Sequence, residues 1–302
     1  MKIKGFLTEN IWNIGIWAIF LALGFPGLGT GFPWYLMRQY LTMVFLVMGL
    51  TLEMMSGVLD LSFMAEVAAG TCVGAALLAA DIPLPVAVAA MVLFHVLSGL
   101  IRGYLIARLK INGVVITLAL QIIWSNLFGI FTGDAAIFFY RSDVYANRRF
   151  WEIMAGLAAA VWLGGRFLLK RTYYGKYVRM MGEDLTAFVE SGLDYVPIRM
   201  ILCAVSSLSF ACGSVIILFI TSAGSSKNGN HYLYPVLAAA CLGGVNFFNG
   251  RGKWSGALLG TMSMVLFLQL MVALGLQSAY ETAFVGLLII AAILWNVLRD
   301  KS

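Results

Sequence analysis

Residues 199–222 read RMILCAVSSLSFACGSVIILFITS, a stretch in which Arg199 is the only charged side chain. An α-helix needs roughly 20 predominantly apolar residues to cross the hydrocarbon core of a bilayer, so this stretch is long enough to span it. On both sides of it, similar apolar runs alternate with polar, glycine or proline breaks. The candidate spans are 10–25, 39–57, 62–80, 84–101, 114–132, 153–169, 199–222, 235–248, 256–276 and 280–298. Because 235–248 is short for a full crossing, we expect it to be broken, re-entrant or tilted.

The composition excludes a protein that folds in water. Of the 302 residues, 61% are hydrophobic and 11% are charged, with a mean hydropathy of +0.91. Soluble domains are nearer half apolar and a quarter charged, so a soluble enzyme, a disordered chain and a nucleic-acid binder are excluded. Ten crossings take about 200 residues and leave no room for a sizeable soluble domain. We predict an all-α, polytopic transmembrane helix bundle of about 10 spans, in which residues 1–302 form a single membrane domain.

The basic residues predict the orientation of the spans. A cytoplasmic N-terminus places fifteen of the twenty lysines and arginines inside and five outside, as the positive-inside rule expects. We therefore predict that both termini are cytoplasmic. Ending the fourth span at residue 101 places Arg102 in a loop, so no arginine lies at mid-span depth, which argues against a voltage sensor.

The densest charge in the sequence lies in the predicted cytoplasmic loop 170–198. Within this loop, residues 183–190 could form two helical turns between Gly182 and Gly192. The loop is either a solvated connector that lies on anionic headgroups or a docking helix for a cytoplasmic partner. The spacing of the residues leaves both interpretations open.

Motifs for catalysis, nucleotide binding and metal binding are not evident. Gly252-Lys253 is followed by Trp254 where the phosphate-binding loop needs Ser or Thr, so ATP would have to bind to another subunit. The histidines His95 and His231 and the four cysteines show none of the spacings of a metal site. We predict no catalytic residue, no metal site and no cofactor bound by this chain.

Three acidic residues fall at membrane depth, where ionisable groups are costly and are functional candidates by default: Glu53, Asp60 and Glu66. Alternatively, Asp60 or Ser62 caps a helix that begins near Leu61. Both roles can coexist, because the ends of broken helices often line the solute pathways of transporters.

Neutral amides within the spans are candidates for contact with a polar, hydroxylated solute. Helix-to-helix hydrogen bonding, worth about 0.6 kcal/mol per bond, is the other role that such side chains have in membranes. The candidates are Gln121, Asn126, Asn246 and Gln269.

Two stretches in the first half carry recognisable motifs. Residues 57–62 (GVLDLS), which include Asp60 and Ser62, are similar to the pattern GGIDLS. Residues 99–117 (GLIRGYLIARLKINGVVIT) are similar to GLxNGxLIxKLxIxxFIxT, with Arg102 where asparagine is usual.

Two further stretches follow in the same order as in the family that they resemble. Residues 175–193 follow GxYxxxxGxNxxAAxxSGI, with Asp184 in place of asparagine, and residues 242–260 follow LGGxSxxGGxGxxxGxxxG, with Asn246 in place of serine. Together the four stretches resemble the permease subunit of bacterial ABC importers for monosaccharides, the ribose/xylose/autoinducer-2 branch. Branched-chain amino-acid and nucleoside permeases are more distant, because they lack the DLS triplet.

The resemblance implies a type II ABC-importer-like permease that imports a monosaccharide or sugar-like solute across the bacterial inner membrane. It implies a permease dimer, cytoplasmic ATPase subunits that bind ATP and Mg²⁺, and an external substrate-binding protein. It makes 170–198 a coupling loop, with ATPase contacts at Gly182, Glu183, Asp184, Ala187, Ser191 and Gly192. It also implies four motif residues of the solute pathway, which are Asp60, Ser62, Gly243 and Gly244.

An ion-gradient-driven secondary transporter of a small polar solute remains the alternative. The sequence shows no mid-span acid pair for ion coupling, which counts against it. The identity of the solute, the choice between homo- and heterodimer and the residues that contact solute are not readable from the sequence.

Overall fold

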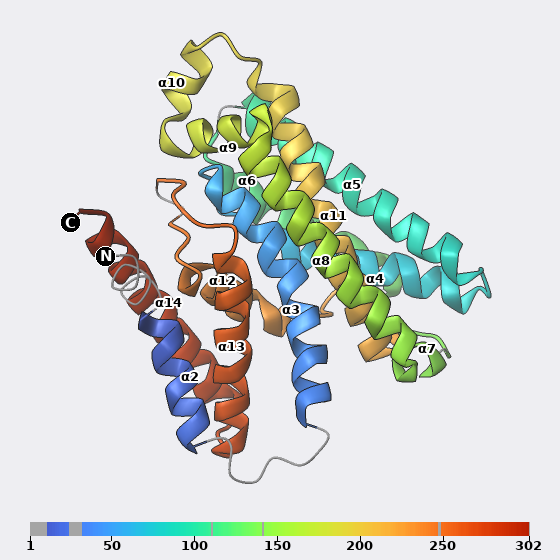
Figure 1. Ribbon diagram of the computed structural model, residues 1–302. Coiled ribbons are helices and arrows are strands. Elements are labelled where there is room, and N and C mark those ends of the chain that lie inside the picture. Colours follow the sequence, from blue (N-terminus) through green and yellow to red (C-terminus); the bar gives the residue numbers. More distant parts are fainter. Residues whose placement is uncertain (1–10, 24–31, 110, 141, 247–248, 302) are drawn as a thin grey trace.

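The computed structural model describes residues 11–23, 32–109, 111–140, 142–246 and 249–301 as a bundle of helices (Figure 1). Ten of its helices overlap the ten predicted spans: α2 (Ile11–Leu23), α3 (Phe32–Met55), α4 (Phe63–Ala79), α5 (Leu84–Leu109), α6 (Gly113–Thr132), α8 (Arg148–Arg171), α11 (Tyr195–Thr221), α12 (Leu233–Leu242), α13 (Gly256–Ala273) and α14 (Ser278–Lys301). The connections contain β1 (Ile137–Phe138), α7 (Ser142–Ala146), α9 (Tyr173–Glu183), α10 (Leu185–Glu190), β2 (Ala223–Gly224) and the 3₁₀ helix η1 (Asn230–Tyr232). The strands β1 and β2 pair antiparallel, Ile137 with Gly224 and Phe138 with Ala223.

Seven helices within the described residues are long and apolar enough to cross a membrane: α3, α5, α6, α8, α11, α13 and α14. The remaining three are shorter, with 17 residues in α4, 13 in α2 and 10 in α12. The predicted polytopic helix bundle is therefore confirmed, whereas the count of about ten spans stays a prediction. The outer residues of the predicted spans 10–25 and 235–248 lie outside the described residues.

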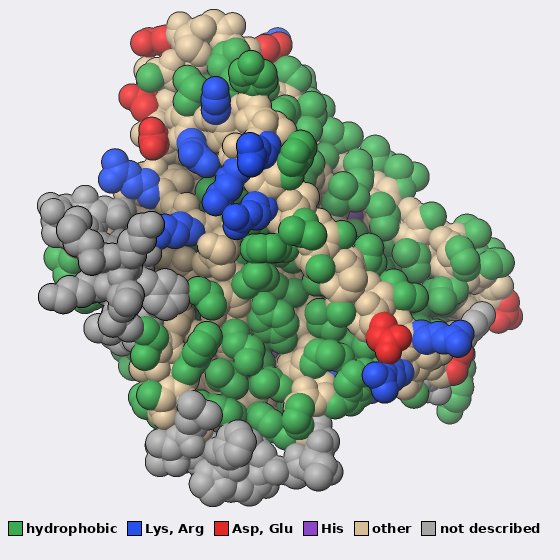
Figure 2. All heavy atoms as spheres, viewed as in Figure 1, with side chains coloured by type: hydrophobic (Ala, Val, Ile, Leu, Met, Phe, Trp, Pro, Cys, Tyr) green, Lys and Arg blue, Asp and Glu red, His purple; other side chains and the backbone are tan. Residues whose placement is uncertain are grey.

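The helices form an inner and an outer group. In α11 and α3, 72% and 67% of the residues of the apolar span are buried, compared with 17% in α14 and 11% in α8. The exposed side chains of the outer helices are themselves large and apolar, such as Ile122, Ile130 and Phe167, and green hydrophobic atoms cover the middle of the molecule in Figure 2. Helices that are apolar all round and exposed on one side are suited to a lipid environment.

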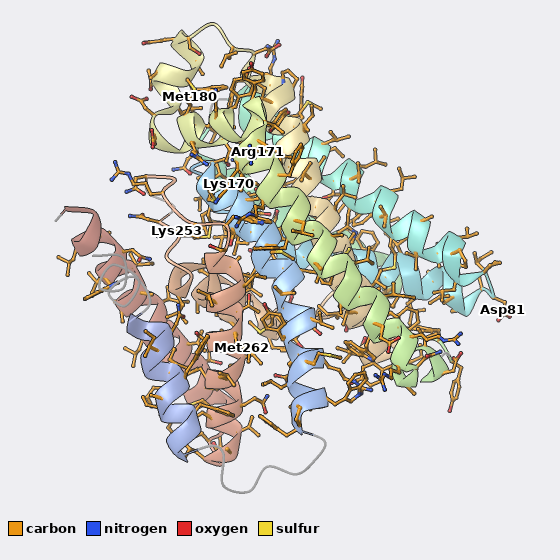
Figure 3. The ribbon with its side chains drawn as sticks, viewed as in Figure 1. Asp81, Lys170, Arg171, Met180, Lys253 and Met262 are labelled. Atoms are coloured by element: carbon orange, nitrogen blue, oxygen red, sulfur yellow. The ribbon has the colours of Figure 1, made fainter. Side chains whose placement is uncertain are left out.

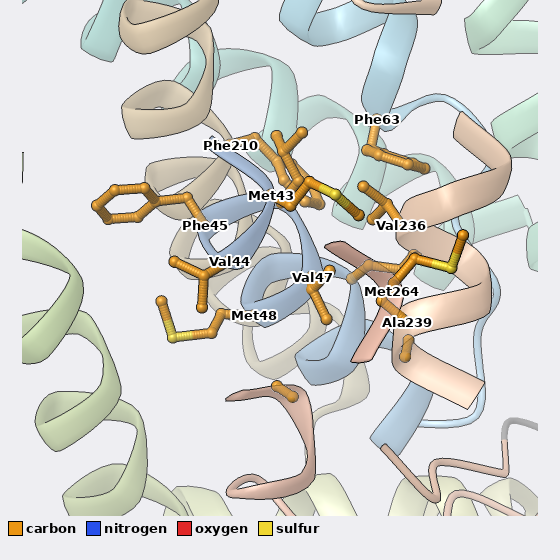
Figure 4. Packing of buried hydrophobic residues seen from close by; sticks show 14 of the residues in the cluster. Met43, Val44, Phe45, Val47, Met48, Phe63, Phe210, Val236, Ala239 and Met264 are labelled. Atoms are coloured by element: carbon orange, nitrogen blue, oxygen red, sulfur yellow. The ribbon is translucent and has the colours of Figure 1, made fainter. Parts of the chain in front are cut away.

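The core forms where α3 meets α11, α12 and α13, and α4 packs on α11 beside it (Figure 4). The Phe63 and Phe210 rings, from α4 and α11, lie 5.5 Å apart between centroids. Because lipid is as apolar as the protein interior, this close packing and its dispersion energy hold the bundle together. Residues of this core labelled in Figure 4 are Met43, Val44, Phe45, Val47, Met48, Phe63, Phe210, Val236, Ala239 and Met264.

Two glycines bring α5 unusually close to α11. A Cβ added at Gly99 would lie 2.6 Å from the carbonyl oxygen of Cys203, and one at Gly103 would lie 2.6 Å from Cα of Met200. Small residues four positions apart allow helix backbones to approach in this way. The side chain of Arg102, adjacent to Gly103, is thereby held against α11.

Two stretches outside the helices interrupt the bundle. Residues 56–62 lie between α3 and α4, and residues 243–255, described at 243–246 and 249–255, lie between α12 and α13. At the end of α12, Asn296 donates to the carbonyl of Cys241 (3.0 Å) and Asn13 donates to the carbonyl of Leu242 (3.3 Å). Side chains thus satisfy the carbonyls that the end of a helix leaves free, which is the condition for ending a helix in the interior of a membrane protein. Of the alternatives expected for 235–248, which were a broken, re-entrant or tilted segment, the end of α12 at Leu242 fits the first.

Candidate functional site

The side chain of Arg102 lies at the centre of a buried ionic cluster. Its Nη2 is 2.7 Å from Oε1 of Glu53 on α3, its Nη1 is 3.2 Å from Oδ2 of Asp60, and the same Nη1 donates to Glu66 on α4. All four side chains are at most 1% exposed. One guanidinium on α5 therefore joins three carboxyl groups that come from α3, the 56–62 break and α4.

Asp60 lies in the break just before α4 and has two sets of contacts. Its Oδ1 accepts hydrogen bonds from the backbone N–H of Ser62 (2.7 Å) and from the Ser62 hydroxyl (2.6 Å), just before α4 begins at Phe63. Its Oδ2 faces Arg102. The Ser62 hydroxyl itself makes no capping bond to α4, so Asp60 both orders the break and belongs to the ionic cluster.

Serine hydroxyls extend the ionic cluster to α11. Arg102 Nη2 donates to Ser207 (3.0 Å) and Ser206 (3.3 Å), and Ser206 in turn donates to Glu53. At the edge of the cluster, Arg199 donates to the hydroxyl of Ser56. Hydrogen bonds of this kind are needed when charges leave water, because Coulomb attraction alone seldom offsets the desolvation cost.

The prediction that Arg102 lies in a loop is wrong. The helix α5 continues for eight residues past the predicted end at 101, to Leu109, because the ionic cluster compensates the charge that seemed to end it. The sequence did not indicate that Glu53 and Glu66 would share one partner, but in the structure both bind the same guanidinium. The sequence did carry a signal for these contacts. Arginine stands at position 102 where the motif has asparagine, and the same chain has acidic residues at positions 53 and 66.

Among the described residues, no group of three or more His, Cys, Asp or Glu side chains is arranged to hold a metal ion. His95 is buried on α5, and its Nδ1 lies 2.8 Å from the carbonyl oxygen of Met91. His231 lies in η1, apart from the ionic cluster. No hydrogen bond or ion pair joins either histidine to Glu53, Asp60, Glu66 or Arg102 among the described residues.

Three glycines, Gly57, Gly182 and Gly250, meet where the two breaks contact α9, and we call this contact the glycine junction. A Cβ added at Gly182 would lie 2.8 Å from Cα of Gly250, and one at Gly57 would lie 3.3 Å from Cα of Gly182. Gly57 and Gly250 also have positive φ values, +81° and +64°, which side chains other than glycine rarely adopt. The end of α9 therefore contacts both breaks with no side chain between the backbones.

Beyond the glycine junction, α9 and α10 project from the bundle (Figure 1). Asp184 ends α9 and caps α10, accepting from the N–H groups of Thr186 (2.8 Å) and Ala187 (3.0 Å). The Phe188 ring is buried, with its centroid 6.1 Å from that of Tyr177 and 6.2 Å from that of Tyr195. This aromatic contact fixes α10 on α9 and α11.

The helix expected over 183–190 is shorter than predicted. It spans Leu185–Glu190, and Gly182 lies inside α9 rather than at the boundary. Gly192, with a φ of +81°, follows its end. Of the six predicted coupling residues, Gly182 is buried, and the other five are exposed: Glu183, Asp184, Ala187, Ser191 and Gly192.

A tyrosine ties α9 to the start of α11. The Tyr174 hydroxyl donates to the carbonyl of Ile198 over 3.2 Å. Burial raises the pKa of Tyr174 to about 12, so the phenol stays protonated and keeps donating at any physiological pH.

Gly243 and Gly244, the predicted motif glycines of the second break, form the turn where α12 returns toward α13. A Cβ added at Gly243 would lie 2.5 Å from the carbonyl oxygen of Gly256, and one at Gly260 would lie 2.7 Å from the backbone nitrogen of Gly243. Gly244 has a φ of +80°. These contacts give the motif a packing role between α12 and α13.

The four amide candidates lie in three separate places. Gln121 and Asn126 are on α6, which packs on α4 and α5, and the Asn126 amide donates to the carbonyl of Ile122 (2.8 Å) on its own helix. Asn246 is buried in the second break, where its backbone N–H donates to the carbonyl of Arg251 (2.7 Å). Gln269 lies on α13, which packs on α12, α3 and α2.

Gln269 has polar partners that the sequence analysis missed. Its amide donates to Oε1 of Gln39 over 2.8 Å, and the amide of Gln39 donates to the Tyr35 hydroxyl over 2.7 Å. Tyr35 and Gln39 are four residues apart and therefore lie on one face of α3. This spacing could have indicated from the sequence that α3 has a polar face. The chain Tyr35–Gln39–Gln269 lies toward the first residues of α3, away from the glycine junction at its other end.

Comparison with known proteins assigns the chain to a family. The family model described as branched-chain amino acid transport system / permease component matches residues 32–293. The L-arabinose ABC transporter permease protein AraH of Azospirillum brasilense is 26% identical, over 100% of this chain and 92% of its own length. The ribose import permease protein RbsC of Haemophilus influenzae is 22% identical, over 86% and 83% of the two chains.

The autoinducer 2 import system permease protein LsrC of Escherichia coli is 25% identical, over 96% of this chain and 88% of its own length. No solved structure matches. The family model covers most of the chain, and both it and the relatives describe transport subunits rather than enzymes. This multi-pass membrane protein therefore belongs to the branched-chain amino acid transport system / permease component family.

Proposed function

We propose that this chain forms the translocation pathway for a monosaccharide or sugar-like solute in an ATP-driven importer. The named relatives are permeases for ribose, L-arabinose and autoinducer 2, whereas the family description names branched-chain amino acids. The DLS triplet at 60–62, which resembles the sugar branch, favours the first group. ATP and Mg²⁺ bind to a separate ATPase subunit, and this chain carries no cofactor.

The glycine junction is the observation that carries this proposal. Residues 170–198 act as a coupling loop within a single permease domain of residues 1–302, and α10 docks on the ATPase. When ATP closes the ATPase dimer, α9 moves with α10, and Gly182 presses on the 56–62 break and on the 243–255 break. Two discontinuous segments beside the ionic cluster then rearrange together, which is the kind of element that can open one side of a bundle as the other closes.

The assembly has about ten spans per chain, both termini in the cytoplasm, a second permease copy and an external substrate-binding protein. With α9 and α10 in the cytoplasm, the first residues of α3 lie at the external side. Tyr35, Gln39 and Gln269 then offer hydrogen-bond donors and acceptors to a neutral, hydroxylated solute as it enters.

An ion-driven transporter is the competing function. The buried carboxyl groups do not favour it, because Arg102 already pairs with Glu53, Asp60 and Glu66. The test is to express the chain with its genomic neighbours and to purify it through a tag on this chain. Co-purification of an ATPase whose hydrolysis is stimulated by solute and binding protein supports the proposal. A chain that purifies alone and moves solute into liposomes under an ion gradient contradicts it.

A further inference from the structure

A basic cavity lies beside the glycine junction, at the end of α8. Its volume is about 620 Å³, and α8, α9 and the 243–255 break all contribute to its lining. In Figure 2, lysines and arginines gather in this region, above the hydrophobic surface of the bundle. Five cationic side chains line the cavity against one acidic side chain, Glu183: Arg166, Lys170, Arg179, Arg251 and Lys253.

The cations on α8 continue a lipid-facing stripe. Leu163 and Phe167 on this helix are 57% and 63% exposed, and Arg166 and Lys170 follow at the three- and four-residue spacing that keeps side chains on one helical face. An acyl chain lying along Leu163 and Phe167 would therefore end at Arg166 and Lys170. This is the level of the headgroups, because α8 is one of the helices long enough to cross the membrane.

The helix α9 and the 243–255 break supply the remaining cations. Arg179 of α9 is held by a 3.2 Å hydrogen bond to the carbonyl of Leu169, and Arg251 and Lys253 belong to the 243–255 break. Figure 3 shows Lys170 and Lys253 at the same end of the molecule. Trp254 also lines the cavity, and its indole N–H donates to the carbonyl of Trp162 over 2.8 Å. The cavity thus combines apolar lining from Met55, Leu169 and Trp254 with cations from α8, α9 and the 243–255 break.

We propose that this cavity binds the phosphodiester headgroup of an anionic phospholipid. An acidic protein surface would fit the charge equally well, but the part of the chain that projects farthest carries acids: Asp184, Glu190 and Asp194. The cations instead lie next to the lipid-facing surface of α8. Because the lipid site adjoins Gly182 and Gly250, its occupancy would stabilise the contact between α9 and the second break. The site does not depend on which solute is carried.

The test measures lipid binding to the full chain, purified in detergent and stripped of lipid. Phosphatidylglycerol and phosphatidylcholine are titrated separately, and bound lipid is counted by native mass spectrometry. The variant Lys170→Gln with Arg251→Gln removes two exposed cations that line the cavity. The matched control, Arg171→Gln with Lys176→Gln, removes two exposed cations from α8 and α9 that do not line it.

Each cation near a membrane surface contributes about fivefold to the binding of an anionic lipid. We expect the parent chain to prefer phosphatidylglycerol, the cavity variant to bind it at least about tenfold more weakly, and the control to resemble the parent. Equal loss in both variants would show diffuse surface charge and overturn the proposal. Displacement of the lipid by excess inorganic phosphate would assign the cavity to a free anion. If the cavity variant still binds lipid but no longer binds the ATPase subunit, the cavity is a contact site for the partner protein.

Discussion

At the scale of single residues, Arg102 determines whether three buried carboxyl groups can remain together. With Arg102→Met, Glu53, Asp60 and Glu66 lose their shared cation while remaining away from water. Breaking a buried ion pair from one side costs about 3–5 kcal/mol. We expect the variant to unfold at a markedly lower temperature than the parent chain, measured by thermal unfolding of both proteins in the same detergent.

The rescue follows from the same charge balance. Arg102→Asn introduces the residue usual in the motif that residues 99–117 resemble, and Glu53→Gln with Glu66→Gln removes two of the three charges that would then be unpaired. The third, Asp60, keeps its hydrogen bonds from Ser62. The triple variant should recover most of the stability lost in Arg102→Met. If the triple variant is no more stable than Arg102→Met, charge compensation is not the role of Arg102. As a control, Arg148→Met breaks the exposed 2.9 Å pair with Glu152 and should cost less than about 1 kcal/mol.

At the scale of elements, the glycine junction connects α9 to two breaks in the bundle. Gly182→Val would place side-chain atoms against the carbonyl of Met55 and Cα of Gly250, so the backbones must separate. We expect solute uptake to fall at least about tenfold while the ATPase subunit stays bound, since a misplaced contact readily costs that much. Uptake and co-purified ATPase are measured together.

The matched control for this variant is Gly164→Val. Gly164 is a helical glycine on the exposed side of α8, and an added Cβ would meet nothing within 4 Å. This variant should transport like the parent. If Gly182→Val also transports like the parent and folds normally, the glycine junction does not transmit motion.

The exposed side of α10 offers a separate test of docking. Ala187 is exposed on this short helix, so Ala187→Arg adds length and charge where a partner surface would lie, without disturbing the buried Phe188. We expect the ATPase subunit to be lost from the purified complex. Ala146→Arg, at an exposed alanine of α7, is the control and should leave the complex intact. An intact complex with Ala187→Arg would contradict docking through this surface.

The sequence predicts the elements better than it predicts their contacts. All ten apolar runs overlap helices because hydrophobicity along the chain is a local signal. The end of α5 was misplaced because the partners of Arg102, Glu66 and Glu53, lie 36 and 49 residues away. Gly182 stood out through its motif, but its contacts with Gly57 and Gly250 arise only when separate breaks fold together. The separation of Gln121 from Gln269 likewise depends on which helices pack against each other.

At the scale of the whole molecule, the charge distribution favours the proposed orientation of the bundle, with both termini in the cytoplasm. Arg102 and Arg199 are buried side chains rather than loop charges, so they no longer count toward the cytoplasmic side. Thirteen lysines and arginines then remain on the cytoplasmic side and five on the external side, so the positive charge still favours the same orientation. The helix α8 joins the two sides: its 24 residues extend about 36 Å, enough to cross a hydrocarbon core of about 30 Å.

This orientation predicts opposite labelling of two engineered cysteines. Ala187→Cys on α10 should react with a membrane-impermeant maleimide only in inside-out vesicles, and Ala146→Cys on α7 only in right-side-out vesicles. The parent chain is the blank, since Cys72, Cys203 and Cys241 are buried and Cys212 is half-buried on the membrane helix α11. The reversed pattern would place α10 outside the cell, where no ATPase could dock on it, and coupling through the glycine junction would be contradicted. Labelling of both cysteines from one side would show that α8 does not cross the membrane.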